Sequence, residues 1–169
     1  MLDIQPIAFF CSKSCPGDII LKAQDWANAR GSESAPVIGG FHTPVEREVL
    51  RILLRAGAPF IIVLARAEQG WRAPKPLGPA IKAAVASGTA QIVSPFPATQ
   101  KRTTAATAET RNRHILTLCD TVLIAHAAPG SKTEALAQEA KTMGLPIFTL
   151  PSPANSHLLQ IGAQIVPDQ

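Results

Sequence analysis

The sequence predicts a single α/β domain of three layers, in which helices cover both faces of a mostly parallel sheet. Apolar, strand-like runs alternate with helical patterns along the chain, and this alternation is typical of such folds. One run, the stretch 59–65 (PFIIVLA), is continuously apolar, as in a parallel strand that is buried on both faces. The length of 169 residues suits one domain with a full core. We therefore expect one domain over 1–169.

The first half of the chain contains seven expected elements. In order they are strand 4–11, helix 15–30, strand 35–40, helix 43–57, strand 59–65, helix 78–87 and strand 89–94. Helix 43–57 has the clearest boundaries, because Thr43 and Glu46 form a capping box, Pro44 suits the first turn and Gly57 suits the end.

The second half continues the alternation. A helix that starts at Ala108 is followed by strand 120–126, helix 131–144, strand 145–150, and a short helix and a short strand within 155–166. In the first of these helices Ala108, Ile115 and Cys119 share one face, and Asn112 falls on the same stripe. A buried amide must be hydrogen-bonded. Asn112 is therefore expected either to fix a neighbouring loop or to contact a ligand.

This order of elements predicts a Rossmann-like domain, and such domains bind ligands beyond the carboxyl ends of their strands. The loops that follow the strands are the candidate binding loops. They cover 12–17, 39–43, 66–75, 94–104, 126–133 and 151–155.

Composition limits the classes of function. The net charge of +4 permits a phosphate-bearing partner without requiring one. The longest apolar run, 60–65, is far shorter than the roughly 20 residues of a membrane-spanning helix, so no membrane partner is expected. The N-terminus carries Asp3 and lacks the positive region of a signal peptide. Three cysteines, an odd number, favour a reducing cytoplasm over a disulfide framework.

No metal site and no cofactor are predicted. Cys11 and Cys15 are four residues apart, and His42 is the only further candidate ligand, which leaves too few for a tetrahedral site. Ordinary thiols explain the two cysteines.

The turn Gly130–Thr133 is the first candidate phosphate site. Ser131 and Glu134 fit a capping box, and the same turn offers free backbone N–H groups that accept anions. The two interpretations are compatible. Gly39 and Gly40 directly follow a strand, where they serve either a turn or the close approach of a ligand.

Basic side chains fall in the same set of loops. Loop 66–75 carries Arg66, Trp71 and Arg72, and its tryptophan suits either packing over the sheet or stacking on a base. Arg102 and Arg111 suit a phosphate because of the planar guanidinium group. The expected phosphate-binding residues are Gly39, Gly40, Arg102, Arg111, Asn112, Gly130, Ser131, Lys132 and Thr133.

The stretch 111–151 (RNRHILTLCDTVLIAHAAPGSKTEALAQEAKTMGLPIFTLP) resembles the signature of the DNA-processing protein A (DprA/Smf) family. The matching positions are Arg111, Asn112, Arg113, Asp120, Gly130, Ser131, Thr133, Gly144 and the run PIFTLP, and in the tail Asn155, Leu158, Leu159, Gly162 and Ala163. The resemblance spans roughly 35–166.

The resemblance implies a Rossmann-like domain that binds single-stranded DNA in a basic pocket, as the family does when it helps to load the recombinase during natural transformation. Arg111, Asn112, Gly130, Ser131 and Thr133 would line that pocket. The sequence departs from the family pattern in the turn HAAPGSK, in Pro151-Ser152 where the family has Pro-Gly, and in the long PVERE helix. It also lacks room for flanking domains, so a stand-alone protein is expected.

A sister family, the Lonely Guy phosphoribohydrolases, supplies the alternative. Its members also place an arginine nine residues before the aspartate of the strand, as Arg111 stands before Asp120. The alternative function is hydrolysis of a nucleoside 5′-monophosphate, with Glu134 as acid/base. Because capping already explains Glu134, the favoured function is binding without chemistry, to a nucleotide or single-stranded DNA, by a cytoplasmic protein that can form a homodimer.

Overall fold

The computed structural model describes residues 5–167 and shows one sheet of seven parallel strands within that range. The strands are β1 Ile7–Cys11, β2 Val37–Gly39, β3 Phe60–Val63, β4 Ala90–Val93, β5 Thr121–His126, β6 Ile147–Thr149 and β7 Gln164–Ile165. The helices are α1 Gly17–Asn28, α2 Pro44–Ala56, α3 Gly78–Ala86, α4 Ala105–Leu118, α5 Lys132–Thr142 and α6 Ser156–Gln160, the last preceded by a 3₁₀ turn at Pro153–Asn155.

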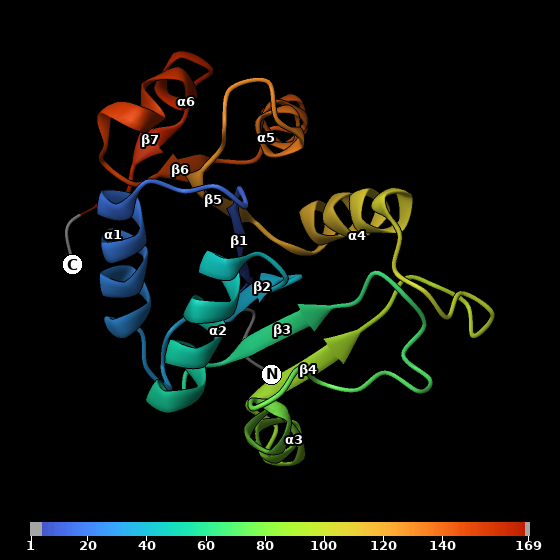
Figure 1. Ribbon diagram of the computed structural model, residues 1–169. Coiled ribbons are helices and arrows are strands. Elements are labelled where there is room, and N and C mark those ends of the chain that lie inside the picture. The colour runs from blue at the N-terminus through green and yellow to red at the C-terminus, as the bar shows by residue number, and fades with distance from the viewer. Residues whose placement is uncertain (1–4, 168–169) are drawn as a thin grey trace.

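Helices cover both faces of the sheet, so the predicted three layers are confirmed (Figure 1). On one face α1, α2 and α3 pack against side chains such as Phe9, Phe60 and Leu123. On the other face α4, α5 and α6 pack against Phe10, Ile38 and neighbouring strand residues. Successive residues of one strand thus belong to different cores, as the two-residue period of a strand requires.

The strand order is β4-β3-β2-β1-β5-β6-β7. The chain moves outward from β1 to one edge of the sheet, then returns to place β5 on the other side of β1. The order therefore reverses between β1 and β5, which is where ligands bind in open parallel sheets. The pairing of these two strands shifts register at Cys11, which lies beside His126.

Local chemistry sets the element ends, with small differences from the prediction. The Thr43–Glu46 capping box is present, and Gly57 ends α2 with φ of 66°. Helix α4 begins at Ala105 rather than Ala108, because Thr104 and Thr107 form a further capping box. Strand β1 begins at Ile7; residue 4 of the predicted strand lies outside the described residues.

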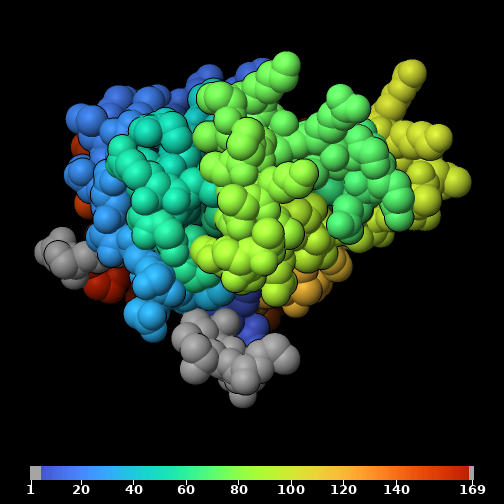
Figure 2. All heavy atoms as spheres, turned by 90° about the horizontal axis from the view of Figure 1, so that it is seen from below, coloured from blue at the N-terminus to red at the C-terminus, as the bar shows by residue number. Residues whose placement is uncertain are grey.

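Two loops at the carboxyl edge lie side by side. Figure 2 shows residues 66–77 (green) next to residues 94–104 (yellow) at one end of the molecule. They are joined by the N–H of Ala67, which donates to the carbonyl of Gln100 (2.6 Å), and by the hydroxyl of Ser94, which donates to the carbonyl of Arg66 (2.6 Å). None of the described helices is both long and apolar enough to cross a membrane.

Candidate nucleic-acid interface

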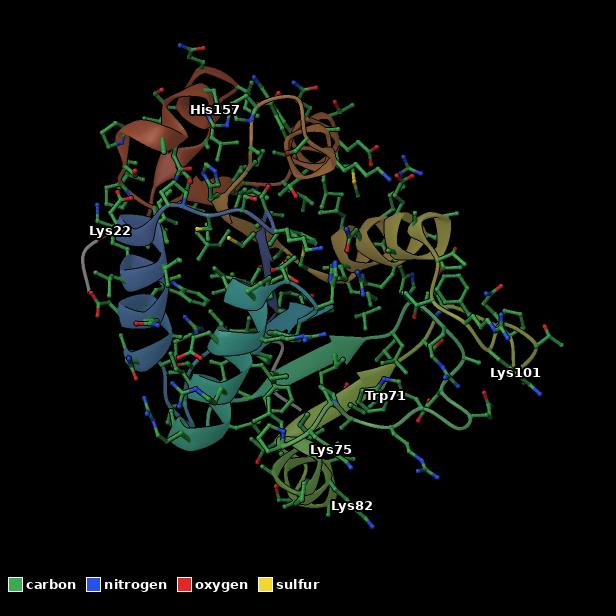
Figure 3. All side chains as sticks on the ribbon, viewed as in Figure 1. Lys22, Trp71, Lys75, Lys82, Lys101 and His157 are labelled. Carbon is green, nitrogen blue, oxygen red and sulfur yellow. The ribbon has the colours of Figure 1, made fainter. Side chains whose placement is uncertain are left out.

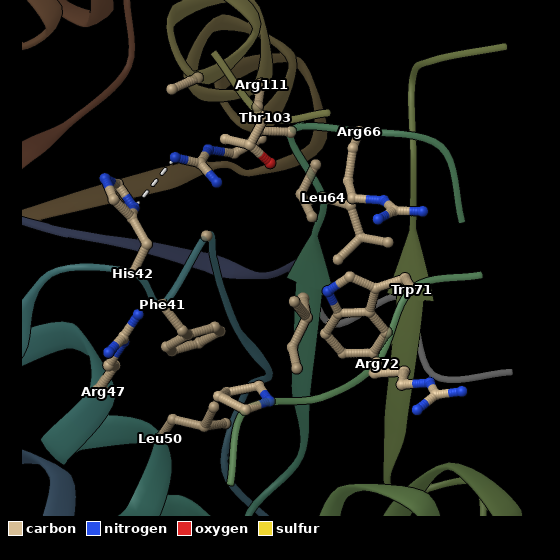
Figure 4. A pocket seen from close by; sticks show the side chains of 16 residues that line it. Phe41, His42, Arg47, Leu50, Leu64, Arg66, Trp71, Arg72, Thr103 and Arg111 are labelled. Atoms are coloured by element: carbon tan, nitrogen blue, oxygen red, sulfur yellow. Dashed lines mark hydrogen bonds between the residues drawn. The ribbon is translucent and has the colours of Figure 1, made fainter. Parts of the chain in front are cut away.

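A pocket rich in arginine lies beyond the ends of β2 and β3, and we call it the arginine pocket. Its volume is about 340 Å³. Its basic side chains are Arg47 on α2, Arg66 and Arg72 on the loop after β3, and Arg111 on α4. The remaining walls are mainly apolar. They include Phe41, Leu50, Ile62, Leu64, Trp71 and Pro74 (Figure 4).

The arginines of the arginine pocket form no ion pairs within the part of the chain that the structure describes. No aspartate or glutamate lines it. None of its four guanidinium groups lies within ion-pair distance of a described carboxylate. Like charges gathered without counter-charges repel one another, and an anion bound among them removes that repulsion. The pocket is therefore suited to an anionic ligand.

Arg111 is the buried member of this set, with 3% of its surface exposed. Its Nε donates to the side-chain carbonyl of Asn112 (2.8 Å), and a terminal nitrogen lies 3.0 Å from Nδ1 of His42. An arginine can only donate, so Nδ1 is the acceptor. Burial lowers the pKa of Arg111, and the nearby Glu46 carboxylate raises it. Arg111 thus orients two neighbouring side chains as well as lining the pocket.

Gly40 makes room for Arg111. A Cβ atom at this position would lie 2.3 Å from a terminal nitrogen of Arg111 and 2.4 Å from its Cζ. No side chain larger than hydrogen fits unless the guanidinium moves. Close approach is therefore the reason for glycine here, and the approaching group is Arg111.

Phe41 is a bulky residue with a left-handed backbone, at φ of 50°. Such a conformation costs free energy in a residue of this size. It places the phenyl ring in the core, edge-on to Phe60 with ring centres 6.3 Å apart. The turn Gly40–His42 therefore carries backbone strain at the rim of the pocket.

Glu46 is a buried carboxylate that ties β1 to the start of α2. One oxygen accepts the N–H of Cys11 (3.1 Å), and the other accepts the N–H of His42 (3.2 Å). Burial raises the pKa of Glu46, but the neighbouring His42 and the backbone N–H donors of Cys11 and His42 outweigh it, so the pKa lies below its usual range. The carboxylate holds the first turn of α2 in place and acts on the nearby Arg111 through its charge.

A second pocket, the switch-point pocket, lies where the strand order reverses and has a volume of about 400 Å³. It is lined by residues 10–14 at and after the end of β1, by His42, Thr43 and Glu46, by Ala105, Ala108, Glu109 and Asn112 of α4, and by Ala128, Ser131, Lys132 and Thr133 around the start of α5. The two pockets share His42 and Ala108, so they are neighbours on one edge.

The turn before α5 forms only half of the expected capping box. The hydroxyl of Ser131 accepts the N–H of Glu134 (3.2 Å). The Glu134 carboxylate reaches one residue further back, to the N–H of Gly130 (3.3 Å), and its other oxygen lies 3.5 Å from His157. Glu134 lines neither pocket. Its carboxylate is occupied by this turn and gives no support to the hydrolytic alternative.

The predicted inward face of helix α4 is confirmed at Ile115 and Cys119 but is wrong at Asn112. Arg111, not Asn112, is the buried polar residue. Asn112 is half-buried and lines the switch-point pocket. Because its carbonyl accepts from Arg111, its NH₂ group must point the other way. Arg111 thereby links the two pockets: it lines one and sets the orientation of an amide in the other.

The structure brings some of the other expected residues together and separates others. Ser131, Lys132 and Thr133 meet Asn112 in the switch-point pocket, and Lys132 is held 2.7 Å from Glu109. The other three expected residues line neither pocket. They are Gly39 within the sheet, Gly130 on an exposed turn and Arg102 on an exposed loop.

Sequence reasoning missed Arg47 and Phe41. Arg47 follows the capping box of α2 by one residue and so points out of the first turn beside the glycine pair. Its position just after a capping box is the sequence feature that could have identified Arg47 as a site residue. Among the described residues, no three His, Cys, Asp or Glu side chains come together to hold a metal ion.

Comparison with known proteins places the chain among DNA-processing proteins. The sequence profile of one family, DNA recombination-mediator protein A, matches residues 4–169. DNA processing protein A from Streptococcus pneumoniae has a TM-score of 0.76 and 20% identity over 96% of this chain. The alignment covers 58% of that protein, so this chain spans under two thirds of its length. No curated protein matches in sequence.

Two further structures share the fold. DNA processing protein A from Helicobacter pylori, described for its binding of single-stranded DNA, has a TM-score of 0.77 and 17% identity over 98% of this chain and 76% of its own. The molybdenum cofactor binding protein from Rippkaea orientalis has a TM-score of 0.67 and 12% identity, over 99% of this chain and 91% of its own. At these identities the likeness concerns the fold.

Proposed function

The chain belongs to the DNA recombination-mediator protein A family, and on this premise we propose that it binds single-stranded DNA at the carboxyl edge of its sheet. The arginine pocket is the observation that carries the proposal. Four arginines and no carboxylate line one cavity on the edge where parallel sheets bind ligands. Guanidinium groups match the geometry of phosphate oxygens, and phosphate contacts supply most of the affinity for a nucleic acid.

The switch-point pocket supplies a second set of donors along the same edge. Asn112, Lys132 and Thr133 line it, and their side chains carry an NH₂ group, an ammonium group and a hydroxyl as donors. The first N–H groups of α5 have no partners inside the helix and suit an anion. We propose that a neighbouring phosphate of the strand binds here, with Gly130 and Ser131 shaping the turn.

The wall that the pockets share sets the path of the strand. His42 lies on this wall, and half of its side chain is exposed. A DNA backbone that passes His42 contacts the arginines on one side and the start of α5 on the other. Arg102, on the exposed loop 94–104, gives the strand a further contact outside the pockets in this proposal.

Binding of fluorescein-labelled thymine oligomers, followed by anisotropy at several salt concentrations, tests the proposal. Each phosphate contact contributes about 0.7 to the slope of log K against log salt for single strands. Arg72→Gln should weaken binding about three- to tenfold and lower the slope by about 0.7. Arg47→Gln should do the same.

Arg51→Gln is the matched control. Arg51 is also on α2, but it pairs with Glu48 and does not line the pocket. This variant should bind DNA as the wild type does. Equal loss in Arg51→Gln and Arg72→Gln would show that only the overall charge matters and would overturn the assignment of the pocket. Absence of binding by the wild-type protein would overturn the proposed function itself.

A further inference from the structure

The arginine pocket has more apolar wall than a phosphate needs. Trp71 stands on one side of it, and Phe41 and Leu50 on the other, as Figure 4 shows. Leu64 and Ile62 lie at its base and are 4% and 3% exposed. Phosphate gains nothing from such surfaces. A flat heterocycle buries apolar area there, while its attached phosphates remain among the guanidinium groups.

Trp71 is held in place before any ligand binds. Its backbone N–H donates to the backbone carbonyl of Glu68 (3.0 Å). The guanidinium of Arg66 donates to two carbonyls of the same loop, those of Ala67 (3.0 Å) and Gln69 (2.8 Å). The loop is thus fixed by its own hydrogen bonds, and a ligand that contacts the indole does not have to order it.

The indole is also only half-buried. One part of it packs against the core beneath, and another part lines the pocket. Figure 3 shows Trp71 close to the end of β4, whereas Lys101 stands at the outer tip of the loop 94–104. The strained turn at Phe41 forms the facing wall. A strained backbone conformation costs free energy, and such conformations cluster at sites where proteins contact ligands.

From this geometry we propose that the arginine pocket takes one base of the bound single strand, stacked on the indole of Trp71. The proposal rests on the proposed function, because it assigns a base to a strand whose phosphates the arginines bind. Every base has a flat aromatic face, so the contact is tolerant of sequence. It adds affinity that does not depend on salt, beside the phosphate contacts that do.

The first test compares a thymine oligomer with an abasic oligomer of the same length and phosphate number. Wild-type protein should bind the thymine oligomer roughly five- to hundredfold more tightly, with the same salt slope for both. Trp71→Ala should lose most of this preference and keep the slope. Trp71→Phe, which keeps an aromatic face, should keep most of the preference.

Tryptophan fluorescence supplies an independent readout. The only other tryptophan, Trp26, is buried on α1 beneath Arg30, whose Cζ lies 4.7 Å from its ring centre. In a Trp26→Phe background the thymine oligomer should quench the remaining fluorescence, and the abasic oligomer should leave it largely unchanged. Stacking on the indole is the physical cause of the quenching.

The outcomes separate the two proposals. If both oligomers bind equally tightly to the wild type and Trp71 fluorescence does not respond, base stacking is overturned while DNA binding stands. If neither oligomer binds, the proposed function is overturned as well. If Trp71→Phe loses as much preference as Trp71→Ala while both stay folded, the aromatic face is not the contact and the inference is wrong.

Discussion

Replacement of Gly40 by alanine tests the central contact of the interface. The added Cβ would lie 2.3 Å from a terminal nitrogen of Arg111, far inside contact distance, so the guanidinium has to move. Moving it breaks the hydrogen bonds to Asn112 and His42. Hydrogen bonds to charged groups contribute about 1.5–3 kcal/mol each, and partial relaxation is expected, so we expect a loss of about 2–4 kcal/mol in the free energy of unfolding.

The assay is urea denaturation followed by circular dichroism. The matched control is Gly31→Ala, because a Cβ there meets nothing within 4 Å, and this variant should stay within about 0.5 kcal/mol of the wild type. A double-mutant cycle then isolates the clash. In an Arg111→Ala background, Gly40→Ala should cost much less, with a coupling of about 1–3 kcal/mol. Additive costs would refute the reasoning, because they would mean that Gly40 and Arg111 do not compete for the same space.

Three further predictions concern the residues around the pockets. The pKa of Glu46 is lowered in the folded state, so its stabilising effect is present above its ordinary pKa of about 4.3 and is lost as the pH falls below it. As the pH is lowered from 7 to 4 and 3, the urea midpoint of unfolding should therefore fall less in Glu46→Gln than in the wild type. Glu109→Gln frees Lys132 in the switch-point pocket and should tighten oligomer binding about two- to fivefold at low salt in the anisotropy assay, an effect that high salt removes. Thr104→Ala removes the cap of α4 and should lower stability by about 1 kcal/mol in thermal denaturation, whereas Thr117→Ala, near the other end of that helix and exposed, should change it little.

The fold could be predicted almost completely because its signals are local. Helix α2 shows this best, since Thr43, Pro44 and Glu46 determine its start and Gly57 its end. The start of α4 was placed three residues late because a capping box of two threonines, Thr104 and Thr107, lacks the usual acidic partner. The strand order lies outside the prediction, because helices that join parallel strands are compatible with more than one order.

The site was less predictable because it depends on contacts between distant segments. Helical periodicity alone does not distinguish Arg111 from Asn112 as the buried residue, since they are adjacent. Arg111 is buried because Gly40, some 70 residues earlier, leaves space for its guanidinium group. The turn 130–133 and Arg111 were expected in one pocket. Gly130 lines neither pocket, and residues 131–133 line a different pocket from Arg111, because the β1–β5 reversal places α5 and the loops after β3 on opposite sides of His42.

The central pairing of β1 with β5 has a consequence for how the protein is made. The strands are joined by more than a hundred residues, so a ribosome exposes the open side of β1 long before β5 emerges. The loop 66–75 and helix α4 also come from different halves of the chain. Neither half alone possesses the complete arginine pocket, so a ligand bound there would stabilise the contact between the early-synthesised half and the late one.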